Sequence, residues 1–107
     1  MNWHQICAID LLAPEHGMPA LVGDNAVAVF RTHDDELFAV GNVDPFSGAG
    51  VISRGIVGDR GGEPTVASPM LKQVFSLRTG LCLDDPEARL PVFRVRRREA
   101  FVEVALP

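Results

Sequence analysis

The stretch "GNVDPFSGAGVISRG" (Gly41–Gly55) decides how this chain folds, because it breaks an otherwise β-rich sequence. It follows the apolar run "LFAV" and sets two apolar residues, Val43 and Phe46, among turn formers. It contains no His, Cys or Lys, the side chains that usually give a stiff, glycine-rich loop its chemistry. The question is what such a loop is for.

A second stretch, "VASPMLKQVFSLRTGLC" (Val66–Cys82), has the same features as the first. In both, a strand-like run leads to a residue followed by proline, and an apolar residue stands near the tip. An interval of about twenty residues between them is compatible with a hairpin connection. The sequence therefore predicts a pair of loops that act together.

Short β-type runs separated by turn signals make up most of the remaining chain. Residues 26–32 and 37–41 flank the acidic turn His33–Glu36 and predict a hairpin, and a second hairpin is expected around Arg98–Glu99. The prolines and glycine of "APEHGMPA" (13–20) are expected to break regular structure. Further strands are expected at 3–9, 50–59, 65–68, 72–77 and 81–83, and one turn of helix within 47–55.

This pattern predicts an all-β protein with eight to ten short strands, in the form of a small antiparallel sandwich or barrel. A length of 107 residues fits a single domain, 1–107. No apolar run is long enough for a membrane helix, and no secretory signal is recognisable, so a cytoplasmic protein is expected. Cys7 and Cys82 lie far apart in apolar segments and are expected to be buried free thiols.

The net charge of −4 argues against a nucleic-acid-binding protein. One basic run, "FRVRRRE" (Phe93–Glu99), stands against this acidic background. The alternation of arginine and valine favours the solvated face of a strand, and a docking patch for an acidic partner is the alternative.

The two loops resemble those of the Rieske family, in which Cys-x-His and Cys-x-x-His grip a [2Fe–2S] cluster. The resemblance places Asp44 and Phe46 at the cysteine and histidine positions of the first loop. It places Ser68 and Leu71 at those of the second loop, so all four ligands are missing. The implied fold is a Rieske-like domain with two protruding, degenerate loops at about 42–50 and 67–73 that lacks the cluster.

The frame around the vacated positions is also similar to the family. Pro45 and Pro69 follow the two cysteine positions, and the strand and turn after the second loop carry Phe75, Thr79, Gly80 and Cys82. Four sequence segments resemble the cluster-free members of this family that are small subunits of assimilatory NAD(P)H-dependent nitrite reductases. They are "GNVDPF", "VISRG", "VASPMLKQVFSL" and "TGLCLDD".

That resemblance implies an accessory subunit of an oxidoreductase complex that reduces nitrite to ammonium in nitrate assimilation. The implied partner is the large catalytic subunit, which in that family carries FAD, an iron–sulfur cluster and siroheme. The small subunit would carry no cofactor and no catalytic residue. Two alternatives remain: an interaction module of another oxidoreductase, or an independent β-domain that binds a small ligand or a peptide.

The residues themselves agree with the loss of the cluster. Neither Phe46 nor Leu71 has a donor atom, and His4 with Cys7 has no second pair at ligand spacing, so no metal site is expected. Instead of iron, Phe46 and Leu71 are expected to pack together, or against Met70, as an apolar plug between the loops. The alternative is that Phe46, Met70, Leu71 and Lys72 form a contact surface for a partner.

Overall fold

The computed structural model describes residues 2–106. Over this range it contains nine strands and two short 3₁₀ helices, in the order β1 (Asn2–Ala8), η1 (Ile9–Leu11), β2 (His16–Val22), β3 (Asn25–Arg31), β4 (Leu37–Gly41), η2 (Ile52–Arg54), β5 (Ile56–Arg60), β6 (Glu63–Ala67), β7 (Val74–Ser76), β8 (Val92–Arg98) and β9 (Phe101–Leu106). Neither helix of the described chain has the length and apolar character needed to cross a membrane.

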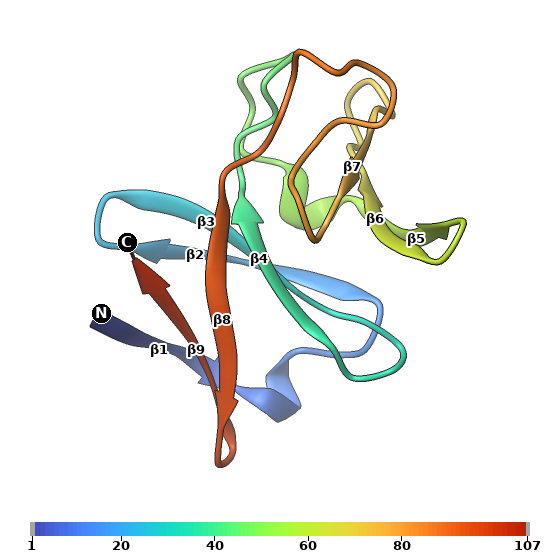
Figure 1. The fold of residues 1–107 in the computed structure, drawn as a ribbon. Helices are drawn as coiled ribbons and strands as arrows, with labels where there is room; N and C mark the ends of the chain where they lie inside the picture. Colours follow the sequence, from blue (N-terminus) through green and yellow to red (C-terminus); the bar gives the residue numbers. More distant parts are fainter. Residues whose placement is uncertain (1, 107) are drawn as a thin grey trace.

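The strands form two antiparallel sheets. Six of them make a curled sheet in the order β1-β9-β8-β4-β3-β2, and β5, β6 and β7 make a smaller sheet. In Figure 1 the smaller sheet and the long loops lie at one end of the molecule, away from the β8–β9 turn. The all-β fold class expected from the sequence is confirmed.

The strand β3 connects two apolar cores because both of its faces are buried. Val27 and Val29 point into the curl of the large sheet, where they meet residues of β9 such as Val102 and Val104. The alternate residues of β3 and β4 point the other way, into a core shared with the small sheet, whose members are Ala28, Phe30, Phe38, Val40, Ile52, Val66, Phe75, Leu77, Cys82 and Leu90. The period-two alternation of a strand explains this division.

Both predicted hairpins are confirmed. Arg31 pairs with Leu37 across the acidic turn, and Arg98 pairs with Phe101 at the start of the β8–β9 hairpin. The single helical turn expected within 47–55 is η2.

Two expectations about strands are wrong. Residues 16–20 belong to β2 although they include Gly17 and Pro19. β2 is an edge strand, where proline is tolerated because a missing N–H can face solvent. Residues 81–83 form only isolated bridges, Phe75 with Cys82 and Leu81 with Arg89, rather than a strand.

One arginine of β8, Arg96, has two specific side-chain partners. The Arg96 guanidinium lies 4.0 Å from the centroid of the Trp3 ring, and its Nε donates to Glu103 Oε1 at 2.7 Å. Stacking of this kind fixes the arginine and covers the aromatic ring.

Both cysteines are free thiols, as expected. Cys82 is buried, but Cys7 is only half-buried, so the expectation of burial is wrong for Cys7. Burial raises the pKa of the Cys7 thiol, which disfavours the reactive thiolate form.

The turn after β7 packs its backbone directly against the segment leading to β8. Gly80 has φ +78, and a Cβ atom built on it would lie 2.1 Å from the Leu90 carbonyl oxygen. The Leu90 N–H donates to the Gly80 carbonyl at 2.7 Å. Glycine is required here because any side chain would force the two segments apart.

We expect Gly80→Ala to lower the free energy of unfolding by roughly 3–5 kcal/mol, since the left-handed conformation and the displaced carbonyl both oppose the methyl group. Gly61→Ala is the matched control: Gly61 also has positive φ but has no neighbour within 4 Å. It should cost only about 1–2 kcal/mol. Chemical denaturation of both variants measures the difference, and equal losses would show that the close approach is unimportant.

Candidate functional site

The two predicted loops are rooted at Asp44 and Ser68, the residues at the vacated cysteine positions. Asp44 is 0% exposed and Ser68 is 1% exposed. Buried polar side chains are expected to have hydrogen-bond partners, and these two residues have several.

Asp44 closes the first loop with its backbone and its side chain. Its N–H donates to the Ala49 carbonyl at 2.8 Å, and its carbonyl accepts the Gly48 N–H at 2.8 Å. Its Oδ1 accepts the Phe46 N–H at 2.8 Å. Gly48 has φ +76, which turns the chain back toward its starting point.

Ser68 closes the second loop in the same way. Its N–H donates to the Gln73 carbonyl at 2.9 Å, and its carbonyl accepts the Lys72 N–H at 3.0 Å. Its Oγ accepts the Met70 N–H at 3.3 Å. Lys72, at the position equivalent to Gly48, also has positive φ, +62.

A third loop repeats the pattern around Ser76, which is fully buried. The Ser76 N–H donates to the Leu81 carbonyl and its carbonyl accepts the Gly80 N–H, both at 2.9 Å. Its Oγ accepts the Arg78 N–H at 3.2 Å. Segments 44–49, 68–73 and 76–81 therefore share one hydrogen-bonding pattern built on a buried polar anchor.

The anchors of the first two loops are bonded to each other. The Ser68 hydroxyl donates to Asp44 Oδ2, and Asp44 Oδ1 accepts a hydrogen bond from the Phe46 N–H. Ser68 Oγ also accepts a hydrogen bond from the Met70 N–H. We name these three hydrogen bonds, from Phe46 through Asp44 and Ser68 to Met70, the interloop relay.

The apolar residues of the loops do not form the fully buried plug that we expected. Phe46 is 36% exposed, and its ring centroid lies 6.3 Å from that of the buried Phe75 in a tilted arrangement. Met70 and Leu71 are 52% and 57% exposed. The polar relay joins the loops where we expected apolar packing. Met70 and Leu71 lie more than half in solvent, and Phe46 is about one third exposed.

A Rieske cluster does not fit this donor set. Such a cluster needs two thiolates on one iron and two imidazoles on the other. Asp44 and Ser68 offer only oxygen atoms, which already bind each other, and Phe46 and Leu71 offer no lone pair. Across residues 2–106, no group of three or more His, Cys, Asp or Glu side chains is placed to hold a metal ion.

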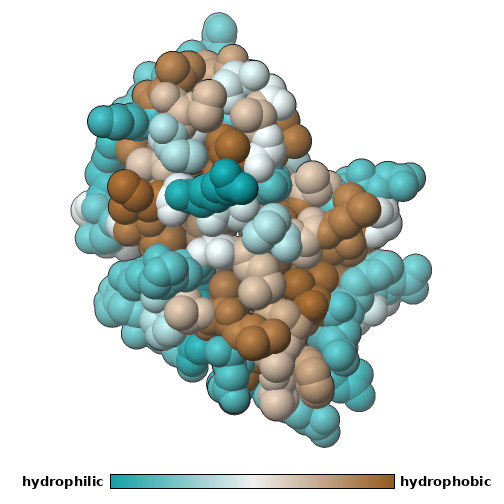
Figure 2. Space-filling view, turned by 180° about the vertical axis from the view of Figure 1, so that it is seen from behind, coloured by the Kyte–Doolittle hydropathy of each residue, from teal (hydrophilic) through white to brown (hydrophobic). Residues whose placement is uncertain are grey.

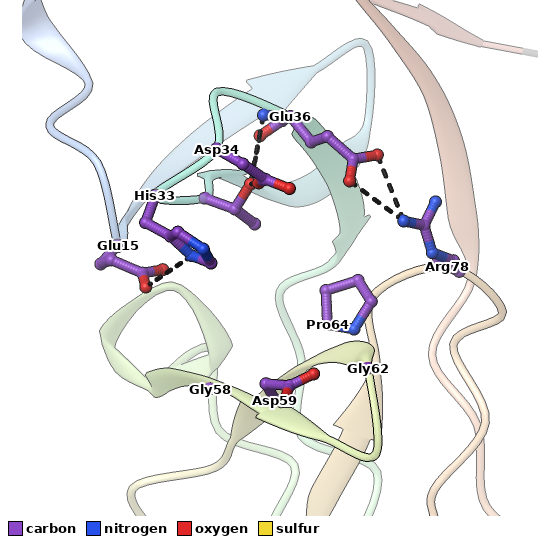
Figure 3. Close-up of a pocket in the computed structure, with 10 residues that line it drawn as sticks. Glu15, His33, Asp34, Glu36, Gly58, Asp59, Gly62, Pro64 and Arg78 are labelled. Atoms are coloured by element: carbon purple, nitrogen blue, oxygen red, sulfur yellow. Dashed lines mark hydrogen bonds and ion pairs between the residues drawn. The ribbon is translucent and has the colours of Figure 1, made fainter.

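A separate hollow of about 200 Å³ lies between the β3–β4 turn and the β5–β6 hairpin (Figure 3). His33 Nδ1 lies 3.3 Å from Glu15 Oε1 on one side of it, and Arg78 Nη2 lies 3.0 Å from Glu36 Oε1 on the other. Pockets for small molecules usually measure about 300–1,000 Å³. The hollow therefore gives little support to a ligand-binding domain.

Sequence reasoning did not identify this hollow, because the residues that line it come from segments far apart in the chain. Arg78 and Glu36 are separated by 42 positions. The hydrogen bond from the Thr32 hydroxyl lowers the pKa of the exposed Asp34 carboxyl at its edge.

The geometry of the two loops agrees with the comparison to protein families. Residues 2–105 match the model of the Rieske-like [2Fe–2S] domain. The chain therefore belongs to the Rieske-like [2Fe–2S] domain family.

Within this family the chain is similar to nitrite reductase small subunits. It is 43% identical to the nitrite reductase (NADH) small subunit of Escherichia coli K12, over 96% of both chains. A crystal structure from Mycobacterium tuberculosis, assigned as an NADH-dependent nitrite reductase small subunit, superposes with a TM-score of 0.95 at 52% identity, covering 99% of this chain and 96% of that one.

A third relative joins a similar segment to a much longer chain. The nitrite reductase [NAD(P)H] large subunit of Klebsiella oxytoca is 39% identical over 94 residues, which are 88% of this chain and 10% of that protein.

We expect Phe46→Ala to lower the free energy of unfolding by about 1–2 kcal/mol, because its ring is only partly buried and contributes only part of a full burial energy. Phe75→Ala is the matched comparison, since Phe75 is fully buried, and it should cost about 3–5 kcal/mol. Urea denaturation of both variants tests this order. A loss at Phe46 as large as that at Phe75 would restore the plug hypothesis.

We also expect the purified protein to show no visible absorption and no acid-labile sulfide, because the donor set lacks thiolate and imidazole. Iron and sulfide analysis after anaerobic expression with added iron is the measurement. Stoichiometric iron with sulfide would show that ligands other than those four positions hold a cluster.

Proposed function

We propose that this chain is an accessory, non-catalytic subunit of an NAD(P)H-dependent nitrite reductase complex, in which it binds the large catalytic chain. The observation that best supports this proposal is at the vacated ligand positions. There Asp44 and Ser68 form a hydrogen bond with each other instead of presenting metal donors. A Rieske-like domain that keeps its loops without metal donors retains the shape of the loops for binding but has no group that accepts an electron.

The fused relative supports the identity of the partner. In the Klebsiella oxytoca protein, a segment similar to this chain is part of the polypeptide named as the large subunit. A covalent connection holds two domains at high effective concentration, so weak contacts between them suffice. A separate small subunit needs a contact surface that provides the association by itself.

The reaction itself then belongs to the partner. By family resemblance the large chain carries FAD, an iron–sulfur cluster and siroheme, and reduces nitrite to ammonium in nitrate assimilation. We place the complex in the cytoplasm, a reducing compartment that suits the two free thiols of this chain.

We propose that the contact surface is the loop end of the molecule. Four apolar residues that are 36–57% exposed flank the two buried anchors there, and we call them the loop-end patch: Val43, Phe46, Met70 and Leu71. Lys72, exposed beside them, adds a positive charge at the edge. Apolar residues rimmed by polar groups are typical of protein interfaces.

Exposed apolar residues alone would not single out this end. Seen from behind, hydrophobic residues occur in both halves of the molecule (Figure 2). Leu21 on β2 is 76% exposed, more than any member of the patch. What supports the loop end is that its apolar residues are held on two hydrogen-bonded loops that have no metal to bind.

We expect Leu71→Glu to weaken binding to the nitrite reductase large chain of the same organism by about tenfold or more, because a charge would be buried against an apolar surface. Leu21→Glu, an equivalent change at an exposed leucine outside the loops, should leave affinity unchanged. Co-purification followed by calorimetric titration measures both. If the two variants behave alike, the loop end is not the interface, and if the wild type instead captures an oxygenase, the chain serves another complex.

A further inference from the structure

We infer that Asp44 and Ser68 are positioning residues that hold the two halves of the loop-end patch in one fixed arrangement for docking. This inference rests on the proposed function. It goes beyond it by assigning the affinity of the subunit to a pair of buried polar side chains that do not themselves touch the partner.

The relay connects the patch directly. Phe46 and Met70 occupy equivalent positions in the two loops, two residues after the anchors. The backbone N–H of each is bonded to the side chain of its own anchor, and the anchors are bonded to each other. A displacement of one loop relative to the other therefore has to break a buried hydrogen bond.

Fixing the patch matters because loose loops bind less tightly. Ordering a mobile interface segment on binding reduces affinity, whereas a preorganised surface avoids this loss. The exposed side chains of Met70 and Leu71 bury too little surface within the chain to position their loop by packing. The positioning falls to the hydrogen bonds at the base of the loop.

The equivalence of the loops gives a specific test. Aspartate and serine both accept the N–H two residues further on, at 2.8 Å in the first loop and 3.3 Å in the second. Exchanging them as Asp44→Ser with Ser68→Asp keeps one carboxylate and one hydroxyl in contact. Ser68→Asp alone places two carboxylates together, and Ser68→Ala removes the donor.

Ser76→Ala is the matched control. Ser76 is equally buried and anchors the third loop with the same bonds. Its loop carries no member of the loop-end patch: Leu77 is buried and Arg78 pairs with Glu36. Leu81, the apolar residue where this loop closes, is 41% exposed and is left unchanged in the control. Loss of this serine should reduce thermal stability without affecting docking.

The experiment measures the Kd for the nitrite reductase large chain by titration at a temperature where circular dichroism shows every variant folded. Hydrogen exchange of the Phe46 and Met70 amides is measured on the free proteins. We expect Ser68→Ala to weaken binding about tenfold and to speed exchange at both amides. Ser76→Ala should change neither, although its melting temperature falls.

The exchanged double variant distinguishes positioning from general stability. It should restore the Kd to within about threefold of wild type, whereas Ser68→Asp alone should weaken binding about a hundredfold or prevent folding. If the wild-type chain binds but Ser68→Ala and Ser76→Ala have equal Kd values, the positioning role is overturned and the proposed function still stands. No binding by the wild-type chain would overturn the proposed function and the docking role together.

Discussion

A single buried hydrogen bond, from the Ser68 hydroxyl to the Asp44 carboxylate, determines how the loop end of this molecule is arranged. A carboxylate removed from water needs donors on both oxygens, because an unsatisfied buried polar group costs about 1–3 kcal/mol or more. The first loop supplies the donors to Oδ1, the N–H groups of Phe46 and Ser47, and the second loop supplies the donor to Oδ2. Neither loop can satisfy its anchor alone, so the polar requirement of one residue fixes the relative position of both loops.

This arrangement is possible because the rest of the fold brings the anchors together without iron. Asp44 follows β4 of the large sheet and Ser68 follows β6 of the small sheet. The core between the sheets, with Phe30, Val66 and Phe75 fully buried, joins these strands by apolar packing. A metal cluster can contribute directly to folding where it is bound. Here the sheets provide that stability, and the hydrogen bonds at the loops adjust only the last few residues.

The sequence predicted the strands better than the contacts between them. Alternation and turn residues were enough for the β3–β4 and β8–β9 hairpins, because both depend on neighbouring residues. β2 was missed because Pro19 indicates a break unless the strand is known to be an edge. Asp44 and Ser68 were recognised as vacated ligand positions, but their bond was not predicted: each residue before proline indicates only a local turn, and the contact spans 24 positions. The exposure of Leu71 likewise depends on the tertiary fold.

An aspartate–serine pair in place of a cluster also gives the loop end a different response to reduction. A [2Fe–2S] centre gains one negative charge on each reduction, so a partner that recognises its surface meets two different electrostatic states. The Asp44–Ser68 pair carries no group that accepts an electron, so the pair itself is not reduced. In the complex that we propose, the subunit would have to remain bound through every oxidation state of its partner. A loop end held by hydrogen bonds, with no electron-accepting group of its own, would meet that requirement, whereas a redox-active one would vary in affinity during turnover.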